Sequence, residues 1–155
     1  DTTWSRGLGD VYKRQRELFV NTVKRILGSS AKEQKVLVID DDKDVRDLMS
    51  RMLDDIGVRP IEARDGKEGL ERTKDKPSLI VLDLEMPRMD GFEFLESYAE
   101  EYAKENRAPI LVYSGKDITD VQEKLLNERV VGFVKKDETS MDELSERISK
   151  LIKNS

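Results

Sequence analysis

Short apolar runs alternate with longer, helically spaced apolar stripes along most of this chain. The runs are rich in β-branched residues and are bounded by polar or turn-forming residues, which is typical of strands buried on both faces of a sheet. They predict five strands, at Val36–Ile39, Val58–Glu62, Leu79–Leu82, Ile110–Tyr113 and Val130–Val134. The stripes between and after them predict helices at Asp44–Ile56, Gly66–Lys76, Asp90–Lys104, Thr119–Asn127 and Ser140–Lys153.

This strict alternation predicts an α/β fold with parallel strands, because parallel neighbours need a crossover that is usually helical. We expect a flavodoxin-like, doubly wound sheet of five parallel strands in the order 2-1-3-4-5, in a three-layer α/β/α arrangement. In that order the first and third strands are neighbours where the winding direction reverses. Their carboxyl ends, Ile39 and Leu82, then open into one crevice, which is where ligands of such sheets bind.

Two segments precede this alternation. Ser5–Gln15 (SRGLGDVYKRQ) resembles a transposase-type sequencing adapter translated in frame, so we interpret residues 1–15 as a scar of assembly and expect them to be disordered. Arg16–Leu27 predicts a helix, because its apolar residues form one stripe at Phe19, Val23, Ile26 and Leu27. We therefore expect an N-terminal helix and linker at 16–34, followed by one folded domain at 35–153.

Composition and charge restrict the chemistry that this chain can perform. Among its 155 residues there is no Cys and no His, which excludes disulfides, thiolate or imidazole metal sites and Ser-His triads, and fits a reducing, cytoplasmic compartment. A net charge of −5 with 39% charged residues does not suggest a nucleic-acid-binding surface. No apolar run approaches the length of a membrane span, so we expect no membrane contact by this segment.

Acidic residues gather where the first and third strands are expected to end. The first strand runs into Asp40, Asp41 and Asp42, and the third runs into Asp83. Because adjacent strands lie about 5 Å apart, Asp83 can approach Asp40 and Asp41, and three carboxylates there repel one another unless a cation binds or their pKa values rise. Oxygen ligands alone favour a hard ion such as Mg²⁺. By itself the acidic run would equally fit the N-terminus of a helix.

The fourth and fifth strands bring a hydroxyl and a lysine to the same edge. Ser114 and Gly115 follow one strand, and Lys135 and Lys136 follow the other. A hydroxyl and an ammonium group can both hold an oxyanion. With the carboxylates and a divalent cation they indicate phosphoryl transfer onto an aspartate, Asp83. Each residue alone fits an ordinary turn or surface position; their coincidence at one sheet edge favours the chemical interpretation.

Four segments of the chain, VLVIDDDKDVR, VLDLEMPRMDG, ILVYSG and GFVKKDE, resemble in order and spacing the signatures of response regulator receiver domains. The resemblance covers about Lys35–Lys153. It implies that Asp83 is the phosphoacceptor. It also implies that Asp40, Asp41 and Asp83, with the backbone carbonyl of Glu85, hold Mg²⁺.

The same resemblance implies a switch formed by Ser114 and Phe133. Lys136 rather than Lys135 matches the family's lysine, because the aromatic Phe133 stands three residues before it. The family often has Pro after this lysine, with a cis peptide bond. Asp137 stands there instead, and a cis bond would cost about 3 kcal/mol, so the isomer of the Lys136–Asp137 bond stays open.

The resemblance implies a phosphoacceptor in a two-component phosphorelay rather than a conventional enzyme. The donor would be a histidine kinase or a histidine phosphotransfer protein, and phosphorylation would switch a partner-binding surface around Thr119–Asn127 and the fifth strand. Both a stand-alone receiver and the terminal receiver of a truncated hybrid sensor kinase fit the sequence.

Three other functions remain as alternatives. A small Mg²⁺-dependent phosphohydrolase would use Asp40 as nucleophile and Asp42 as acid, but the chain has no second acidic pair on a later strand. An FMN carrier would need a first loop rich in Ser, Thr and Gly, whereas aspartates there repel phosphate. A receiver-like scaffold that is never phosphorylated would not need the complete acidic set.

Overall fold

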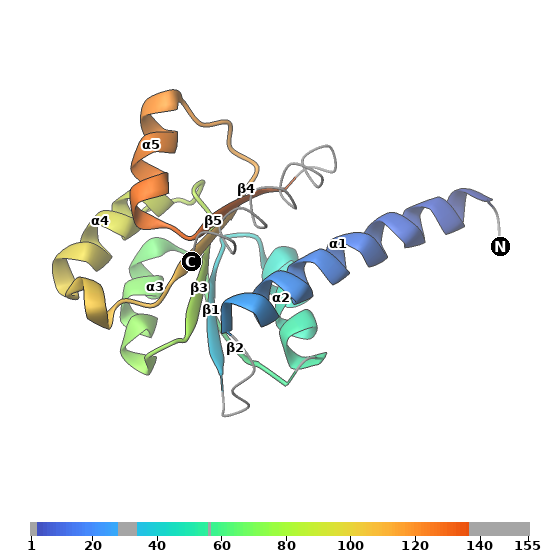
Figure 1. Ribbon diagram of the computed structural model, residues 1–155, viewed down its shortest axis with the longest axis horizontal. Helices are drawn as coiled ribbons and strands as arrows, with labels where there is room; N and C mark the ends of the chain where they lie inside the picture. The colour runs from blue at the N-terminus through green and yellow to red at the C-terminus, as the bar shows by residue number, and fades with distance from the viewer. Residues whose placement is uncertain (1–2, 28–33, 56, 137–155) are drawn as a thin grey trace.

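The computed structural model describes residues 3–27, 34–55 and 57–136 of the chain, which form a parallel sheet with helices on both faces (Figure 1). The elements in order are α1 (Thr3–Leu27), β1 (Lys35–Ile39), α2 (Lys43–Asp55), β2 (Arg59–Ala63), α3 (Gly66–Arg72), the 3₁₀ turn η1 (Thr73–Asp75), β3 (Leu79–Leu82), α4 (Gly91–Glu101), the 3₁₀ turn η2 (Lys104–Asn106), β4 (Ile110–Ser114), α5 (Asp120–Arg129) and β5 (Gly132–Lys135). The helix expected at Ser140–Lys153 and the Lys136–Asp137 bond lie outside the described residues.

The five strands are parallel and lie in the order β2-β1-β3-β4-β5, which confirms the predicted α/β architecture. In the register of the sheet, Ile39 of β1 lies beside Leu82 of β3, and Leu82 lies beside Val112 of β4. The carboxyl ends of these strands therefore meet at one edge. The residues that follow them, Asp40 and Asp83, become neighbours although they are far apart in the chain.

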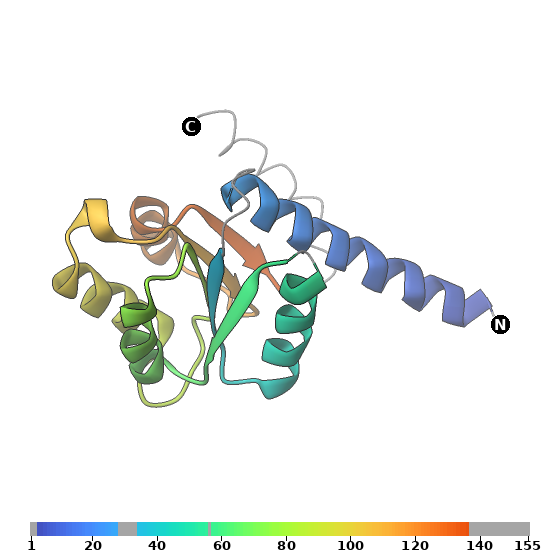
Figure 2. The same cartoon turned by 90° about the horizontal axis from the view of Figure 1, so that it is seen from below.

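The sheet is covered on both faces, which explains the unbroken apolar runs of its central strands. All four residues of β3 are buried, as are four of the five residues of β1. Helices α3, α4 and α5 lie on one side of the sheet and α1 and α2 on the other, as seen when the molecule is turned (Figure 2). Successive residues of a strand point to opposite faces of the sheet. In β1, Val36 and Val38 therefore pack in one apolar layer and Leu37 and Ile39 in the other.

Residues 3–15 are helical, where we expected disorder, and residues 1–2 lie outside the described part of the chain. One continuous helix, α1, runs from Thr3 to Leu27, and its N-terminal part extends beyond the rest of the molecule (Figure 1). Extending an existing helix costs far less than starting one, and the turns of α1 that pack on the sheet supply the start. The origin of residues 1–15 as an adapter scar stays a prediction.

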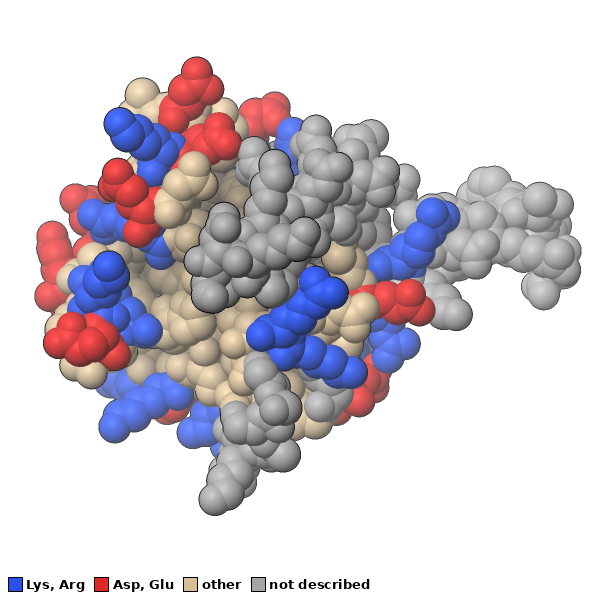
Figure 3. Space-filling model, viewed as in Figure 1, with Lys and Arg blue, Asp and Glu red and all other residues tan. Residues whose placement is uncertain are grey.

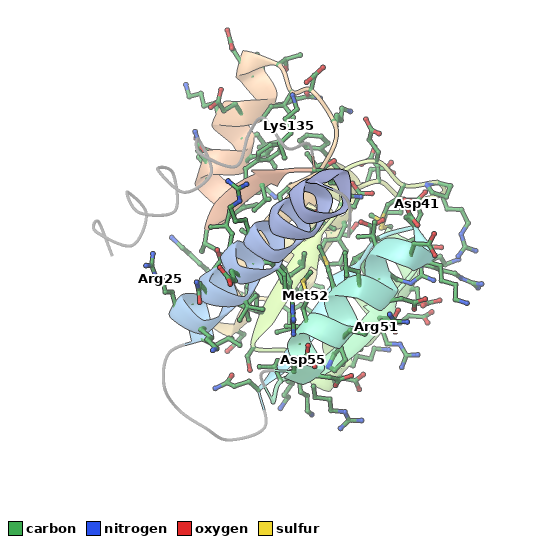
Figure 4. The ribbon with its side chains drawn as sticks, turned by 90° about the vertical axis from the view of Figure 1, so that its right-hand side faces the viewer. Arg25, Asp41, Arg51, Met52, Asp55 and Lys135 are labelled. Carbon is green, nitrogen blue, oxygen red and sulfur yellow. The ribbon has the colours of Figure 1, made fainter. Side chains whose placement is uncertain are left out.

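Helix α1 packs on the sheet beside α2 (Figure 4). Val23 is fully buried and belongs to the same apolar layer as Met49 and Leu53 of α2. An ion pair between Arg16 of α1 and Asp55 at the end of α2 adds a polar contact between the two helices. The C-terminal part of α1 is thus one of the covers of this sheet face. None of the described helices has the length and apolarity that a bilayer crossing requires.

We predict that Val23→Ala lowers the free energy of unfolding by about 2 kcal/mol, because it removes buried methyl groups and leaves a cavity. Urea unfolding followed by circular dichroism measures this loss. The matched control is Lys24→Ala on the exposed side of the same turn, for which we expect a change within about 0.5 kcal/mol. Equal effects of the two substitutions would show that α1 does not pack on the sheet.

Candidate functional site

Three carboxylates meet at the carboxyl edge of the sheet. Oxygen atoms of Asp40, Asp41 and Asp83 all lie within 4.8 Å of one another. Asp40 and Asp83 are only 2% and 4% exposed, whereas Asp41 is exposed. The backbone continues the sheet by one residue here, because the N–H of Asp83 donates to the carbonyl of Ile39 at 2.9 Å. The predicted approach of Asp83 to Asp40 and Asp41 is confirmed.

Lys136 is the cation that faces this acidic cluster. Its Nζ donates to Oδ2 of Asp40 at 2.8 Å and lies 3.6 Å from Oδ2 of Asp83, while also lying over the ring of Tyr113. Lys135, one residue earlier, pairs instead with Asp117 at 2.6 Å. Neighbouring residues of a strand point to opposite faces, so only one of the two lysines can reach the acids.

The pKa values at this site reflect burial opposed by charge pairing. Burial raises the pKa of Asp40, and the charge of Asp83 adds to this, although Lys136 and the N–H of Asp42 oppose it. Burial alone would lower the pKa of Lys136, but its hydrogen bond to Asp40 and the two nearby carboxylates raise it instead. Lys136 therefore stays charged at neutral pH. One ammonium group does not balance three carboxylates, and an excess of negative charge remains.

The loop after Asp83 is folded tightly against the acidic cluster. The N–H of Glu85 donates to Oδ1 of Asp83 at 3.2 Å, which places the main chain of Glu85 beside the carboxylate. A Cβ atom on Gly91 would lie 2.6 Å from the carbonyl oxygen of Asp83, so only glycine permits this approach. Asp90 and Glu93 form a capping box that starts α4 at this point.

Ser114 and Phe133 lie on the two strands next to the cluster. Ser114, at the end of β4, is fully buried, and its Oγ accepts a hydrogen bond from the N–H of Lys116 at 3.3 Å. Across the residues that the structure describes, no hydrogen bond joins Ser114 to Asp83. Phe133 of β5 is half-buried and packs on the apolar layer beneath α3, α4 and α5. It lies beside Val112 of β4, two residues before Ser114.

The donor set of the cluster fits a hard divalent cation. Two of the three carboxylates are buried and fixed by the sheet, while Asp41 lies on the solvent side. Mg²⁺ prefers oxygen ligands and retains several waters, so a partly open, all-oxygen site suits it. The predicted ligands Asp40, Asp41 and Asp83 are therefore brought together, and the main chain of Glu85 lies next to them.

Two arginines near the site were missed in the sequence. Arg46 of α2 donates to the carbonyl of Asp40 at 2.7 Å and pairs with Glu62 at 3.4 Å. A cation near the start of a helix is disfavoured by the helix dipole. This unfavourable position of Arg46 could have indicated that its side chain has a tertiary contact. Arg88 pairs with the buried Asp65. That pair joins two loops whose contact the sequence does not indicate.

Comparison with known proteins identifies the family. Residues 36–149 match the family model described as the response regulator receiver domain. The chain belongs to this family. Its members are phosphoacceptors of two-component signalling, and the predicted resemblance is confirmed.

Among curated proteins, the receiver is similar to parts of longer proteins. It is 36% identical over 94 residues to a probable transcriptional regulator of Porphyridium aerugineum, covering 60% of this chain and 37% of that one. It is also 36% identical over 91 residues to the sensor histidine kinase CheAY of Helicobacter pylori, covering 57% of this chain and 11% of that one. The receiver thus spans well under two thirds of these relatives.

Solved receiver structures share the fold. A receiver protein domain of Methanoculleus marisnigri JR1 has a TM-score of 0.60 and 32% identity, covering 75% of this chain and 94% of that one. The response regulator TrrA of Thermotoga maritima, solved in complex with Mg²⁺ and BeF, has a TM-score of 0.58 and 27% identity, covering 76% and 98%.

We predict that Lys136→Gln lowers the free energy of unfolding by about 3 kcal/mol at pH 7, because it leaves buried carboxylates without their cation. The matched control is Lys135→Gln, which loses a pair with the exposed Asp117 and should cost no more than about 1 kcal/mol. Urea unfolding without divalent ions measures both. A larger loss for Lys135→Gln would contradict this assignment of the cluster's cation.

The deficit of Lys136→Gln should shrink as the pH falls. Burial raises the pKa of Asp40 in the folded protein, and Lys136 opposes that rise. Removing Lys136 therefore raises the pKa of Asp40 further, and the folded variant binds a proton at a higher pH than the folded wild type. Stability conferred by that proton grows as the pH falls through the folded pKa and is complete below the unfolded one. Urea unfolding of this variant and of the wild type from pH 7 down to pH 5 measures the trend. A constant deficit would contradict the repulsion argument.

Proposed function

We propose that this receiver accepts a phosphoryl group on Asp83 in a Mg²⁺-dependent reaction and thereby switches a surface for a protein partner. The observation that carries the proposal is the meeting of Asp40, Asp41 and Asp83 within 4.8 Å, with Lys136 against two of them. Mg²⁺ would be held by the three carboxylates and the backbone carbonyl of Glu85. The Mg²⁺ and BeF complex of TrrA, a similar receiver, supports the choice of ion.

The chain's own groups suit an in-line displacement at phosphorus. A carboxylate oxygen of Asp83 forms the new O–P bond while the donor's bond to phosphorus breaks, and the departing group keeps the electron pair. Bound Mg²⁺ supplies charge neutralisation for the phosphoryl oxygens. Lys136, 3.6 Å from Asp83, adds one positive charge beside the same oxygens. Ser114 lies on the adjacent strand, from which its hydroxyl can donate to the new phosphoryl group.

The switch would pass from this edge to α5 and β5. Ser114 ends β4, and Phe133 of β5 lies beside Val112, two residues before Ser114, so an inward movement of Ser114 would alter the packing around Phe133. Val121 and Leu125 of α5 are 80% and 39% exposed and lie one helical turn apart. Acidic and basic side chains lie side by side over α4 and α5 (Figure 3). A mixed surface with exposed apolar residues suits a protein partner better than a nucleic acid.

The donor would be a histidine kinase or a histidine phosphotransfer protein, as for other receivers, and the absence of His from this sequence fits a role as acceptor only. Its relatives place receivers in transcriptional regulators and also in a sensor histidine kinase. Both contexts, a response regulator and a hybrid kinase, therefore fit this receiver, and a cytoplasmic location suits either. A phosphohistidine on a partner protein would be the physiological phosphoryl donor.

We predict that acetyl phosphate with Mg²⁺ adds one phosphoryl group to the protein, because Asp83 is a nucleophile beside a cation site. Intact-mass spectrometry should show one adduct, and EDTA should abolish it. Asp83→Asn should give no adduct, whereas Asp42→Asn, an exposed acid beside the cluster, should give it. An adduct that persists in Asp83→Asn, or steady hydrolysis of p-nitrophenyl phosphate that depends on Asp40, would contradict the proposal.

We also predict that Mg²⁺ alone stabilises the protein, since a ligand that binds only the folded state raises the unfolding temperature. The comparison is between Asp41→Asn and Asp42→Asn, adjacent exposed acids of which only Asp41 belongs to the cluster. Differential scanning fluorimetry should show a rise in Tm for the wild type and Asp42→Asn, and a smaller rise for Asp41→Asn. Equal responses of the two variants would remove Asp41 from the ligand set.

A further inference from the structure

An ion pair outside the acidic cluster joins the loop after Asp83 to the start of α3. Asp65 is the N-cap residue of α3, and Arg88 lies in the middle of the loop between β3 and α4. We refer to these two residues as the Asp65–Arg88 clamp. Nothing in the chemistry of Asp83 requires this pair, so its place in the fold needs a separate explanation.

Asp65 is buried and fully engaged. It is only 2% exposed; its Oδ1 accepts the N–H of Glu68 at 2.9 Å, and its Oδ2 accepts from Nε of Arg88, also at 2.9 Å, and from Nη2. Burial by itself would raise the pKa of Asp65, but these hydrogen bonds and the charge of Arg88 bring it below its ordinary value. Asp65 is thus a fixed anion at the start of α3, and it holds one particular side chain of the loop.

The loop is shaped to meet Asp65. Arg88 has a φ of +67°, a left-handed backbone conformation that residues other than glycine rarely adopt. The next residue, Met89, accepts the N–H of Gly66 at 3.2 Å, and a Cβ atom on Gly66 would lie 2.7 Å from Met89. Helix α3 and the loop therefore touch through main chain and side chain together, and the clamp closes that contact.

The other end of the same loop lies at the phosphoacceptor. The N–H of Glu85 donates to Oδ1 of Asp83, and the N–H of Gly91 donates to the carbonyl of Leu84 at 3.2 Å, which closes the loop on itself. A short loop held at both ends has little freedom in between. We propose that the Asp65–Arg88 clamp positions the main chain of Glu85 for the divalent cation, so that Arg88 is a positioning residue of the cation site.

This inference rests on the proposed Mg²⁺ site, and the sign of one effect distinguishes it from simple electrostatics. Removing a positive charge near a cation site strengthens cation binding by Coulomb's law. Removing a positioning contact weakens binding, and loss of outer contacts to metal ligands reduces metal affinity by about tenfold or more. For Arg88 the two effects therefore have opposite signs.

The test is a Mg²⁺ titration of the full chain without phosphodonor, followed by amide NMR shifts. The variant is Arg88→Asn, because asparagine tolerates a positive φ while losing the guanidinium group. We expect about tenfold weaker Mg²⁺ binding than in the wild type. Arg88→Lys keeps the positive charge but loses the paired N–H donors of the guanidinium group. It should also weaken Mg²⁺ binding, but by less.

The matched control is Arg64→Asn, which removes the same charge next to Asp65. Among the described residues Arg64 forms an ion pair with Glu68 on the surface, and its side chain is 68% exposed. We expect Mg²⁺ binding in this control to be unchanged or slightly tighter. In Asp65→Asn the N-cap is retained but the clamp is lost, so adding Arg88→Asn to it should weaken binding little further.

Amide hydrogen exchange provides a readout that does not depend on Mg²⁺. Residues 84–91 should exchange faster in Arg88→Asn than in the wild type, while β1 and β3 should be unchanged. Unchanged or tighter Mg²⁺ binding by Arg88→Asn would overturn the clamp and leave the proposed function intact. A wild-type protein that binds no Mg²⁺ would overturn both. Faster exchange throughout the protein, including β1 and β3, together with weaker binding would show a general loss of stability and would overturn a local positioning role.

Discussion

Mutual repulsion of three carboxylates in one crevice, only partly balanced by one lysine, is the constraint on which the functional edge of this receiver depends. Asp40 and Asp83 are buried, so water screens their charges poorly. Lys136 reaches them from a position 96 residues further along the chain than Asp40. The remaining negative charge of this cluster suits it to binding a cation.

The sheet supplies the core and the geometry of this cluster at the same time. Its central strands are buried on both faces, with α1 and α2 on one side and α3 to α5 on the other (Figure 2). Asp40 and Asp83 are the residues immediately after β1 and β3. The hydrogen-bonded pairing of these two strands, which also orders the core, therefore sets the spacing of their carboxylates. Scaffold and site are therefore one structure, and a shift in register would disperse the site.

The loops around the edge connect the cluster to distant surfaces. The loop that follows Asp83 contacts the start of α3. Ser114 ends β4 and Phe133 lies on β5, the two strands that α5 connects. The proposed phosphorylation of Asp83 would therefore act next to elements that lead to two separate parts of the surface. Rigid strands with short, contacting loops suit such coupling, because packed elements move as units rather than deforming gradually.

The strands and the acidic cluster could be predicted from the sequence because they depend on local pattern and on the regular geometry of parallel sheets. An apolar run that ends in Asp83 indicates a buried strand whose carboxyl end lies at one edge of the sheet. The strand beside it follows from the right-handed crossover connections of parallel sheets. Helix α1 could not be delimited in this way, because its N-terminal extension depends on the turns that pack against the sheet.

By itself, then, the sequence determined the order of elements, the acids and their shared edge, because periodicity and connectivity are properties of the chain alone. The resemblance indicated Lys136 rather than Lys135, and the tertiary structure places Lys136 against the acids. Only the tertiary structure decided that Asp65 meets Arg88. Those contacts depend on the direction of side chains on a strand and on the approach of two loops. The spacing of residues along the chain does not give the distance between the two loops.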